Sequence, residues 1–131
     1  MSLLNYWRSI LWALLSLVAC VLPGNRIPKI NKIAIPHFDK VVHFTLFFVL
    51  TLLLFYENRL RTGNVKLSRE PIFWIIVAII LYASVLEGLQ YFFIASRSGN
   101  LADLAANFLG VFVAVLVYAF VAKFLINPKS T

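Results

Sequence analysis

The sequence is poor in cysteine and in charge. Cys20 is its only cysteine, which excludes an intrachain disulfide and a metal site built from several cysteines. Charged residues make up 13% of the chain, about half the share of about 25% that is usual in soluble domains. Only five residues are acidic. Neither H-E-x-x-H nor G-x-S-x-G occurs, so the sequence lacks the zinc-peptidase pattern and the nucleophile elbow of hydrolases.

Apolar residues dominate instead. They make up 62% of the 131 residues, and the mean hydropathy is +0.90. This composition excludes a disordered chain and disfavours a water-soluble globule. The length gives room for one domain, over residues 1–131. Twelve basic residues give a net charge of +7, which on such a chain favours orientation in a membrane over binding of nucleic acid.

Four stretches are long and apolar enough to suggest membrane spans. A bilayer core of about 30 Å needs about 20 apolar helical residues, and these stretches show no strand-like alternation. Turn and cap residues separate them, at Pro23–Gly24, Pro36, Pro71 and Ser98–Asn100. The sequence therefore predicts an all-α membrane protein, a compact bundle of four transmembrane helices over about residues 4–22, 39–57, 71–94 and 101–125.

The first stretch has an alternative interpretation. Arg8 followed by an apolar run resembles a signal peptide, and Leu17–Cys20 resembles a lipoprotein cleavage site. The residues after Cys20 are apolar, whereas the start of a mature lipoprotein is usually polar. A retained span is therefore the preferred interpretation, with Cys20 as an ordinary buried thiol.

The basic residues favour one orientation weakly. Seven lie on the side that holds both termini, and five lie on the other side. The positive-inside rule then predicts cytoplasmic termini in the cell membrane. Glu57 and Glu70 flank the basic loop of the terminal side and are expected to be solvated. The seven are Arg8, Arg59, Arg61, Lys66, Arg69, Lys123 and Lys129, and the five are Arg26, Lys29, Lys32, Lys40 and Arg97.

The other three carboxylates fall at the opposite ends of the predicted spans. Each lies three or four residues from a second polar side chain, so that both share one helix face. Three helices thus bring polar pairs to a similar depth, with two basic residues nearby. The candidate ligand-binding residues are Asp39 with Lys40 and His43, Glu87 with Gln90, Arg97, and Asp103 with Asn107.

Ionisable groups at membrane depth are energetically costly and point to function, most strongly for Glu87 and then for His43. The others have structural alternatives. Asp39 is a candidate helix cap, and Asp103 is a candidate for a capping box with Asn100. Asn107 is equally a candidate for an interhelical hydrogen bond. Arg97 has the alternative of a counter-ion, and His37 is expected in a solvated loop.

Small residues recur every fourth position in the fourth predicted span. Such a stripe lets another helix approach closely, within one chain or between two, so it leaves the oligomeric state open. Asp103 and Asn107 lie on the adjacent stripe and are expected to point toward a neighbouring helix. The small residues are Ala102, Ala106, Gly110 and Ala114.

These segments resemble the VanZ-like family of small bacterial membrane proteins. The similar segments are Asp39–Phe44, Glu87–Gln90, Arg97 and Asp103–Gly110, in that order, and Leu22–Gly24 is similar to the family's usual end of the first span. The resemblance covers nearly the whole chain. It implies a four-span fold and, through the founding member, a link to reduced sensitivity to teicoplanin. It implies no particular biochemical activity.

Three functions compete. In the first, a non-enzymatic envelope protein binds membrane lipid, a cell-wall precursor head group or a lipid-tailed glycopeptide antibiotic, without a cofactor or nucleic acid. Lys40 and Arg97 would meet an anionic group, and Gln90 and Asn107 would add hydrogen bonds.

In the second, an intramembrane enzyme acts on a lipid-linked substrate. Glu87 or Asp103 would be the general base and His43 its partner. A less favoured variant would hold a metal with His43, Asp39, Glu87 and Asp103. The third function, a small transporter, fits least, because the first span carries no acid and the cluster lies near one membrane face.

Overall fold

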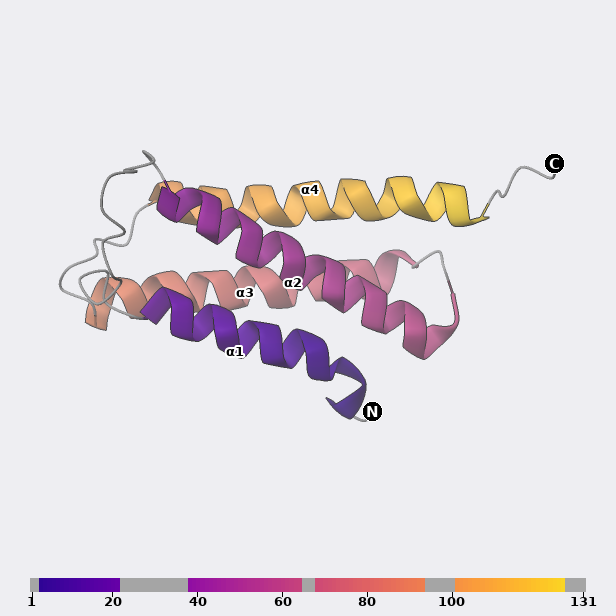
Figure 1. Ribbon diagram of the computed structural model, residues 1–131, viewed down its shortest axis with the longest axis horizontal. Coiled ribbons are helices and arrows are strands. Elements are labelled where there is room, and N and C mark those ends of the chain that lie inside the picture. Colours follow the sequence, from indigo (N-terminus) through magenta and orange to yellow (C-terminus); the bar gives the residue numbers. More distant parts are fainter. Residues whose placement is uncertain (1–2, 22–37, 65–67, 94–100, 127–131) are drawn as a thin grey trace.

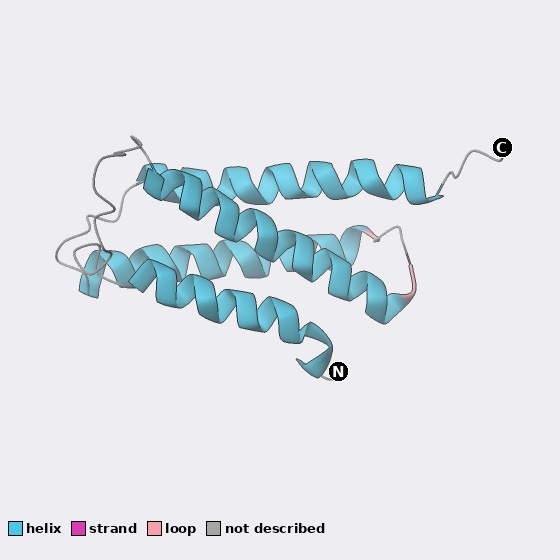
Figure 2. Cartoon of the chain, viewed as in Figure 1, coloured by secondary structure: helices cyan, strands magenta, loops and turns pink. Residues whose placement is uncertain are grey.

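The computed structural model describes residues 3–21, 38–64, 68–93 and 101–126, and its secondary structure there is helical (Figure 2). A 3-10 turn η1 (Leu3–Tyr6) leads into α1 (Trp7–Val21), which is followed by α2 (Phe38–Thr62), α3 (Arg69–Phe93) and α4 (Leu101–Ile126). Successive helices run in opposite directions (Figure 1). The start of α1 and the end of α4 therefore share one end of the bundle, here called the terminal end. The start of α2, the end of α3 and the start of α4 share the other, the distal end.

The four predicted helices are present, and three of them have membrane-spanning length. α2, α3 and α4 are long and apolar enough to cross a membrane, whereas α1 has 15 residues. At about 1.5 Å per residue α1 is shorter than a bilayer core. It begins later than predicted because residues 3–6 form a 3-10 turn. The predicted turn residues Pro23–Gly24, Pro36 and Ser98–Asn100 lie outside the described residues.

α2 continues past its predicted end at residue 57. Gly63 ends it with a φ of 68°, and its N–H donates to the carbonyl of Arg59 at 2.9 Å. A left-handed glycine at this position is a common helix C-cap, because glycine has no Cβ to strain that conformation. The prediction ended the helix at the first charged residue, but Glu57 and Asn58 are buried inside the bundle.

A small core holds the four helices together, and much apolar surface is left outside it. Phe92 and Leu101 expose 78% and 84% of their surface, and exposed aliphatic and aromatic side chains occur along every helix. A water-soluble monomer rarely exposes so many large apolar side chains, whereas lipid tails cover them without cost. The core cluster consists of Cys20, Phe47, Ile79, Ala83, Leu86 and Val111.

α2 and α4 form the largest helix–helix interface. Gly110 is the point of closest approach, since a Cβ there would collide with the carbonyl oxygen of Phe44 and lie 3.1 Å from the amide nitrogen of Phe48. Ala114, one turn further, is fully buried. The predicted small-residue stripe thus packs against another helix, and at Gly110 that helix belongs to the same chain.

We predict that Gly110→Ala destabilises the protein. The added Cβ meets the α2 backbone, which cannot rotate away as a side chain can, and overpacking of this kind costs about 1–3 kcal/mol. Thermal unfolding in detergent measures the loss. Gly88→Ala is the matched control, because its Cβ would meet nothing within 4 Å. Equal stability of the two variants would contradict the close approach of α2 and α4.

Candidate ligand-binding site

The polar residues of three helices meet at the distal end. The first turns of α2 carry Lys40 and His43, the last turns of α3 carry Glu87, and the first turns of α4 carry Asp103 and Asn107. The alternating helix directions bring these segments together, and the contact at Gly110 holds α4 against α2 one turn below Asn107. We call these five residues and Asp39 the distal cluster.

Lys40 forms the outer part of the distal cluster. Its Nζ lies 3.0 Å from Oδ1 of Asp103 and 3.3 Å from Oδ2 of Asp39. The Lys40 side chain is 26% exposed and that of Asp103 is 12% exposed. Asp39 is the more exposed partner. The lysine therefore links the starts of α2 and α4 and still reaches the surface.

His43 and Asn107 form the inner part. Nδ1 of His43 lies 3.0 Å from Oδ1 of Asn107, and both side chains are buried. With Asn107 Oδ1 as the acceptor, the Nδ1 of His43 carries the hydrogen and the lone pair is on Nε2. Oε1 of Glu87 lies 3.8 Å from the same Nδ1, an ion-pair distance when the imidazole is protonated. The interhelical hydrogen bond that was one of the two alternatives for Asn107 is thus present.

The distal cluster holds more acidic than basic side chains. Asp39, Glu87 and Asp103 supply three carboxylates, and Lys40 is the single lysine among them. The predicted arginine, Arg97, lies outside the described residues, as do His37 and Asn100. A site with this set offers mainly acceptors for amine and hydroxyl groups, and one cation for an acidic group.

Gln90 has a different role from the rest. Its Nε2 donates to the backbone carbonyl of Cys20 at 2.9 Å, and its side chain is buried. This bond joins the distal ends of α3 and α1. Gln90 therefore supports the position of α1, and its amide nitrogen is already engaged within the protein.

The metal variant finds no support in this geometry. In the four described segments, no three His, Cys, Asp or Glu side chains gather closely enough to hold a metal ion. Asp103 is instead paired with Lys40, and His43 is hydrogen-bonded to Asn107.

A second polar cluster at the terminal end was missed by the sequence interpretation. Glu57 was expected to be solvated but is 1% exposed, so that expectation was wrong, while Glu70 is exposed as expected. The Glu57 carboxylate accepts hydrogen bonds from the amides of Arg8 and Ser9, at 3.0 and 3.2 Å, and from the Ser9 hydroxyl at 2.5 Å. It thereby caps the start of α1 from another helix.

The helical spacing of α2 indicates that Glu57 lies on its buried face. Glu57 lies seven residues after Leu50, and Leu50 lies seven after His43, so the three share one face of α2. All three are buried. The adjacent Asn58 is buried as well and accepts hydrogen bonds from Tyr6 and Arg61, both at 3.2 Å.

We predict that Glu57→Gln destabilises the protein by about 1–3 kcal/mol, because the new amide would present a donor to groups that already donate. Chemical denaturation in detergent measures the change. Glu70→Gln is the matched control, and as an exposed substitution it is expected to stay within about 0.5 kcal/mol of the wild type. An unaffected Glu57→Gln variant would exclude a capping role for this carboxylate.

The fold and the distal cluster define a class of protein. It is a helical protein of the membrane-spanning type, with polar side chains of three helices gathered at one end. Comparison with protein families matches residues 3–123 to VanZ/LLP1. The chain belongs to the VanZ/LLP1 family, as the resemblance of its motifs implied. No curated protein and no solved structure matches it.

Proposed function

We propose that the protein crosses the cell membrane four times and binds the polar head group of a lipid-anchored molecule with its distal cluster. In this proposal both termini are cytoplasmic and the distal end lies at the outer face. The excess of basic residues on the terminal side supports the orientation. Membrane-length α2, α3 and α4 support the location.

The bonds of α1 support its inclusion as the fourth span. It is tied to the other helices at its start by Glu57, in its middle by Trp12, and at its end by Gln90. Trp12 donates to the carbonyl of Leu46 at 2.9 Å. Hydrogen bonds between helices are favoured in lipid, because water does not compete for the polar groups.

The ligand chemistry follows from the Lys40–Asp103 pair, which is the observation that carries the proposal. The pair is partly exposed at the distal end of α2 and α4. The buried hydrogen bond between His43 and Asn107 lies about one helical turn further into the bundle. Lys40 would meet an acidic group of the ligand, and Asp39 and Glu87 would accept from its amine or hydroxyl groups. Arg97 is a further candidate for the acidic group.

Three sources share this head-group chemistry: a zwitterionic membrane lipid, a lipid-linked cell-wall precursor and a lipid-tailed glycopeptide antibiotic. Binding of the third, or of the precursor that such a drug recognises, would lower sensitivity to teicoplanin-like drugs. In this proposal the protein acts only by binding the head group. It needs no bond to be made or broken, and the buried His43–Asn107 bond would keep the site rigid.

The contact between His43 and Glu87 favours one alternative, an intramembrane enzyme. The hydrogen on Nδ1 leaves the lone pair of His43 on Nε2, where an imidazole acts as a general base. Glu87 Oε1 lies 3.8 Å from the same Nδ1, so a carboxylate and an imidazole are placed together. The substrate in this alternative would again be lipid-linked.

We predict that Lys40→Gln and Glu87→Gln each weaken binding of the true ligand about tenfold, the usual effect of losing one charged hydrogen bond. Purified protein in nanodiscs is titrated separately with phosphatidylethanolamine, a lipid-linked cell-wall precursor and teicoplanin. A polyprenol without a head group controls for binding of the tail. The three titrations identify which source supplies the ligand.

Charge-matched controls at the terminal end are Glu70→Gln and Lys123→Gln, both exposed. They are expected to bind like the wild type. Equal losses in all four variants would refute a distal site, as would binding of the polyprenol as tight as that of the head-group lipids. Chemical conversion of the precursor by the wild type, lost in Glu87→Gln, would establish the enzyme alternative instead.

A further inference from the structure

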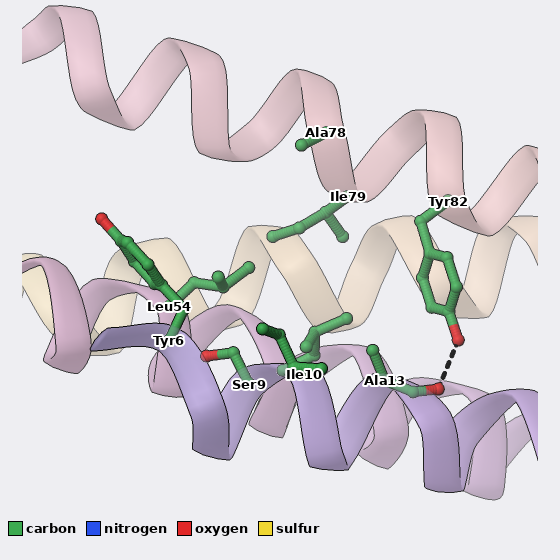
Figure 3. A pocket seen from close by; sticks show the side chains of 9 residues that line it. Tyr6, Ser9, Ile10, Ala13, Leu54, Ala78, Ile79 and Tyr82 are labelled. Atoms are coloured by element: carbon green, nitrogen blue, oxygen red, sulfur yellow. Dashed lines mark hydrogen bonds between the residues drawn. The ribbon is translucent and has the colours of Figure 1, made fainter. Parts of the chain in front are cut away.

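A cavity of about 180 Å³ lies between α1, α2 and α3, in the half of the bundle nearer the terminal end (Figure 3). Its walls are mainly aliphatic, with Ile10 and Ala13 from α1, Leu54 from α2 and Ile79 from α3. Tyr82 limits it on the distal side, where its hydroxyl donates to the carbonyl of Ala13 at 2.5 Å. The cavity is separate from the distal cluster.

The cavity opens to the lipid-facing surface of the bundle. Ile10 and Ala78, which line it from α1 and α3, are both exposed. α1 and α3 face each other across this gap in Figure 3. An apolar molecule in the bilayer can therefore enter sideways, without passing through the polar ends of the helices.

The polar groups of the lining are already engaged. The hydroxyl of Ser9 donates to Glu57, that of Tyr6 donates to Asn58, and that of Tyr82 donates to Ala13. An ordered water needs about two to four polar partners, and this lining leaves it few. The lining therefore suits a hydrocarbon chain.

Two residues that do not line the cavity, Asn58 and Arg61, lie beyond Tyr6 at its terminal end. Asn58 is 1% exposed, and its Nδ2 has no hydrogen-bond acceptor among the residues that the structure describes. Its Oδ1 accepts from Tyr6, which lines the cavity, and from the guanidinium of Arg61, which is exposed. The guanidinium of Arg61 therefore places an exposed positive charge near the Tyr6 end of the cavity.

We propose that this cavity is a phospholipid site, in which one acyl chain lies between α1 and α3 and the head group lies at the terminal end. The chain fills the apolar cavity as far as Tyr82. The phosphate oxygens accept from Arg61, so an acidic phospholipid is favoured over a zwitterionic one. This site does not depend on the proposed function of the distal cluster.

The test uses the full-length protein, equilibrated with vesicles of equal parts phosphatidylglycerol and phosphatidylcholine, then extracted in mild detergent. Native mass spectrometry counts the lipids retained. The wild type is expected to keep one phospholipid, with phosphatidylglycerol in excess. Ala78→Phe, which fills the cavity, is expected to lower the retained fraction about tenfold, the factor for excluding about two methylene groups.

Ala19→Phe is the matched control, because Ala19 is exposed on α1 and does not line the cavity. It is expected to retain lipid like the wild type. Should Ala78→Phe fail to fold, Ala13→Leu fills the same space from α1 and decides the matter. Unchanged retention in the filling variant, equal loss in Ala19→Phe, or no lipid on the wild type would overturn the proposal.

Arg61→Gln separates the head group from the chain. It is expected to abolish the preference for phosphatidylglycerol while one phospholipid is still retained. An unchanged preference would refute the contact between Arg61 and the phosphate, and with it the assignment of the head group to the terminal end.

Discussion

The close approach of α2 and α4 at Gly110 is the constraint on which the distal half of the molecule depends. Glycine leaves room for the backbone of α2 at Phe44, and the helices cannot separate there without losing their largest interface. His43 precedes that contact on α2, and Asn107 lies one turn before Gly110 on α4. The packing of the two backbones therefore brings His43 and Asn107 within hydrogen-bond distance. The same packing places Lys40 beside Asp103 nearer the surface.

The terminal half is held differently, because α1 packs through polar groups as well as apolar ones. Glu57 accepts hydrogen bonds from the first amides of α1, and Trp12 of α1 donates to an α2 carbonyl. Tyr82 and Gln90 of α3 donate to α1 carbonyls. These bonds fix α1 in place, although with 15 residues it is too short for extensive apolar packing. The cavity between α1 and α3 lies beside these bonds, and α1 and α3 each contribute one small side chain to its lining, Ala13 and Ala78.

Much of this was predictable from the sequence, and the failures have physical causes. The spacing of Asp39, His43, Glu87, Asp103 and Asn107 predicted one cluster, because helix length and alternating direction decide which ends meet. The small-residue stripe predicted close packing but left its partner open, which required the position of Phe44. The burial of Glu57 was missed because its charge was weighed above its place on the buried face of α2. The Gln90 bond depends on a backbone carbonyl, which no residue type reveals.

We propose that the distal cluster receives the head group of a lipid-anchored molecule. His43 reports on this directly, since it lies between Asn107 and Glu87 at the base of the cluster. In a His37→Gln background, ¹⁵N-histidine labelling leaves one imidazole, whose two nitrogen shifts are measured in bilayers by solid-state NMR. A lipid-linked cell-wall precursor is added in one sample and a polyprenol without a head group in another. If the head group binds at the distal cluster, the His43 shifts change with the head-group ligand alone. Identical shifts with both would contradict it.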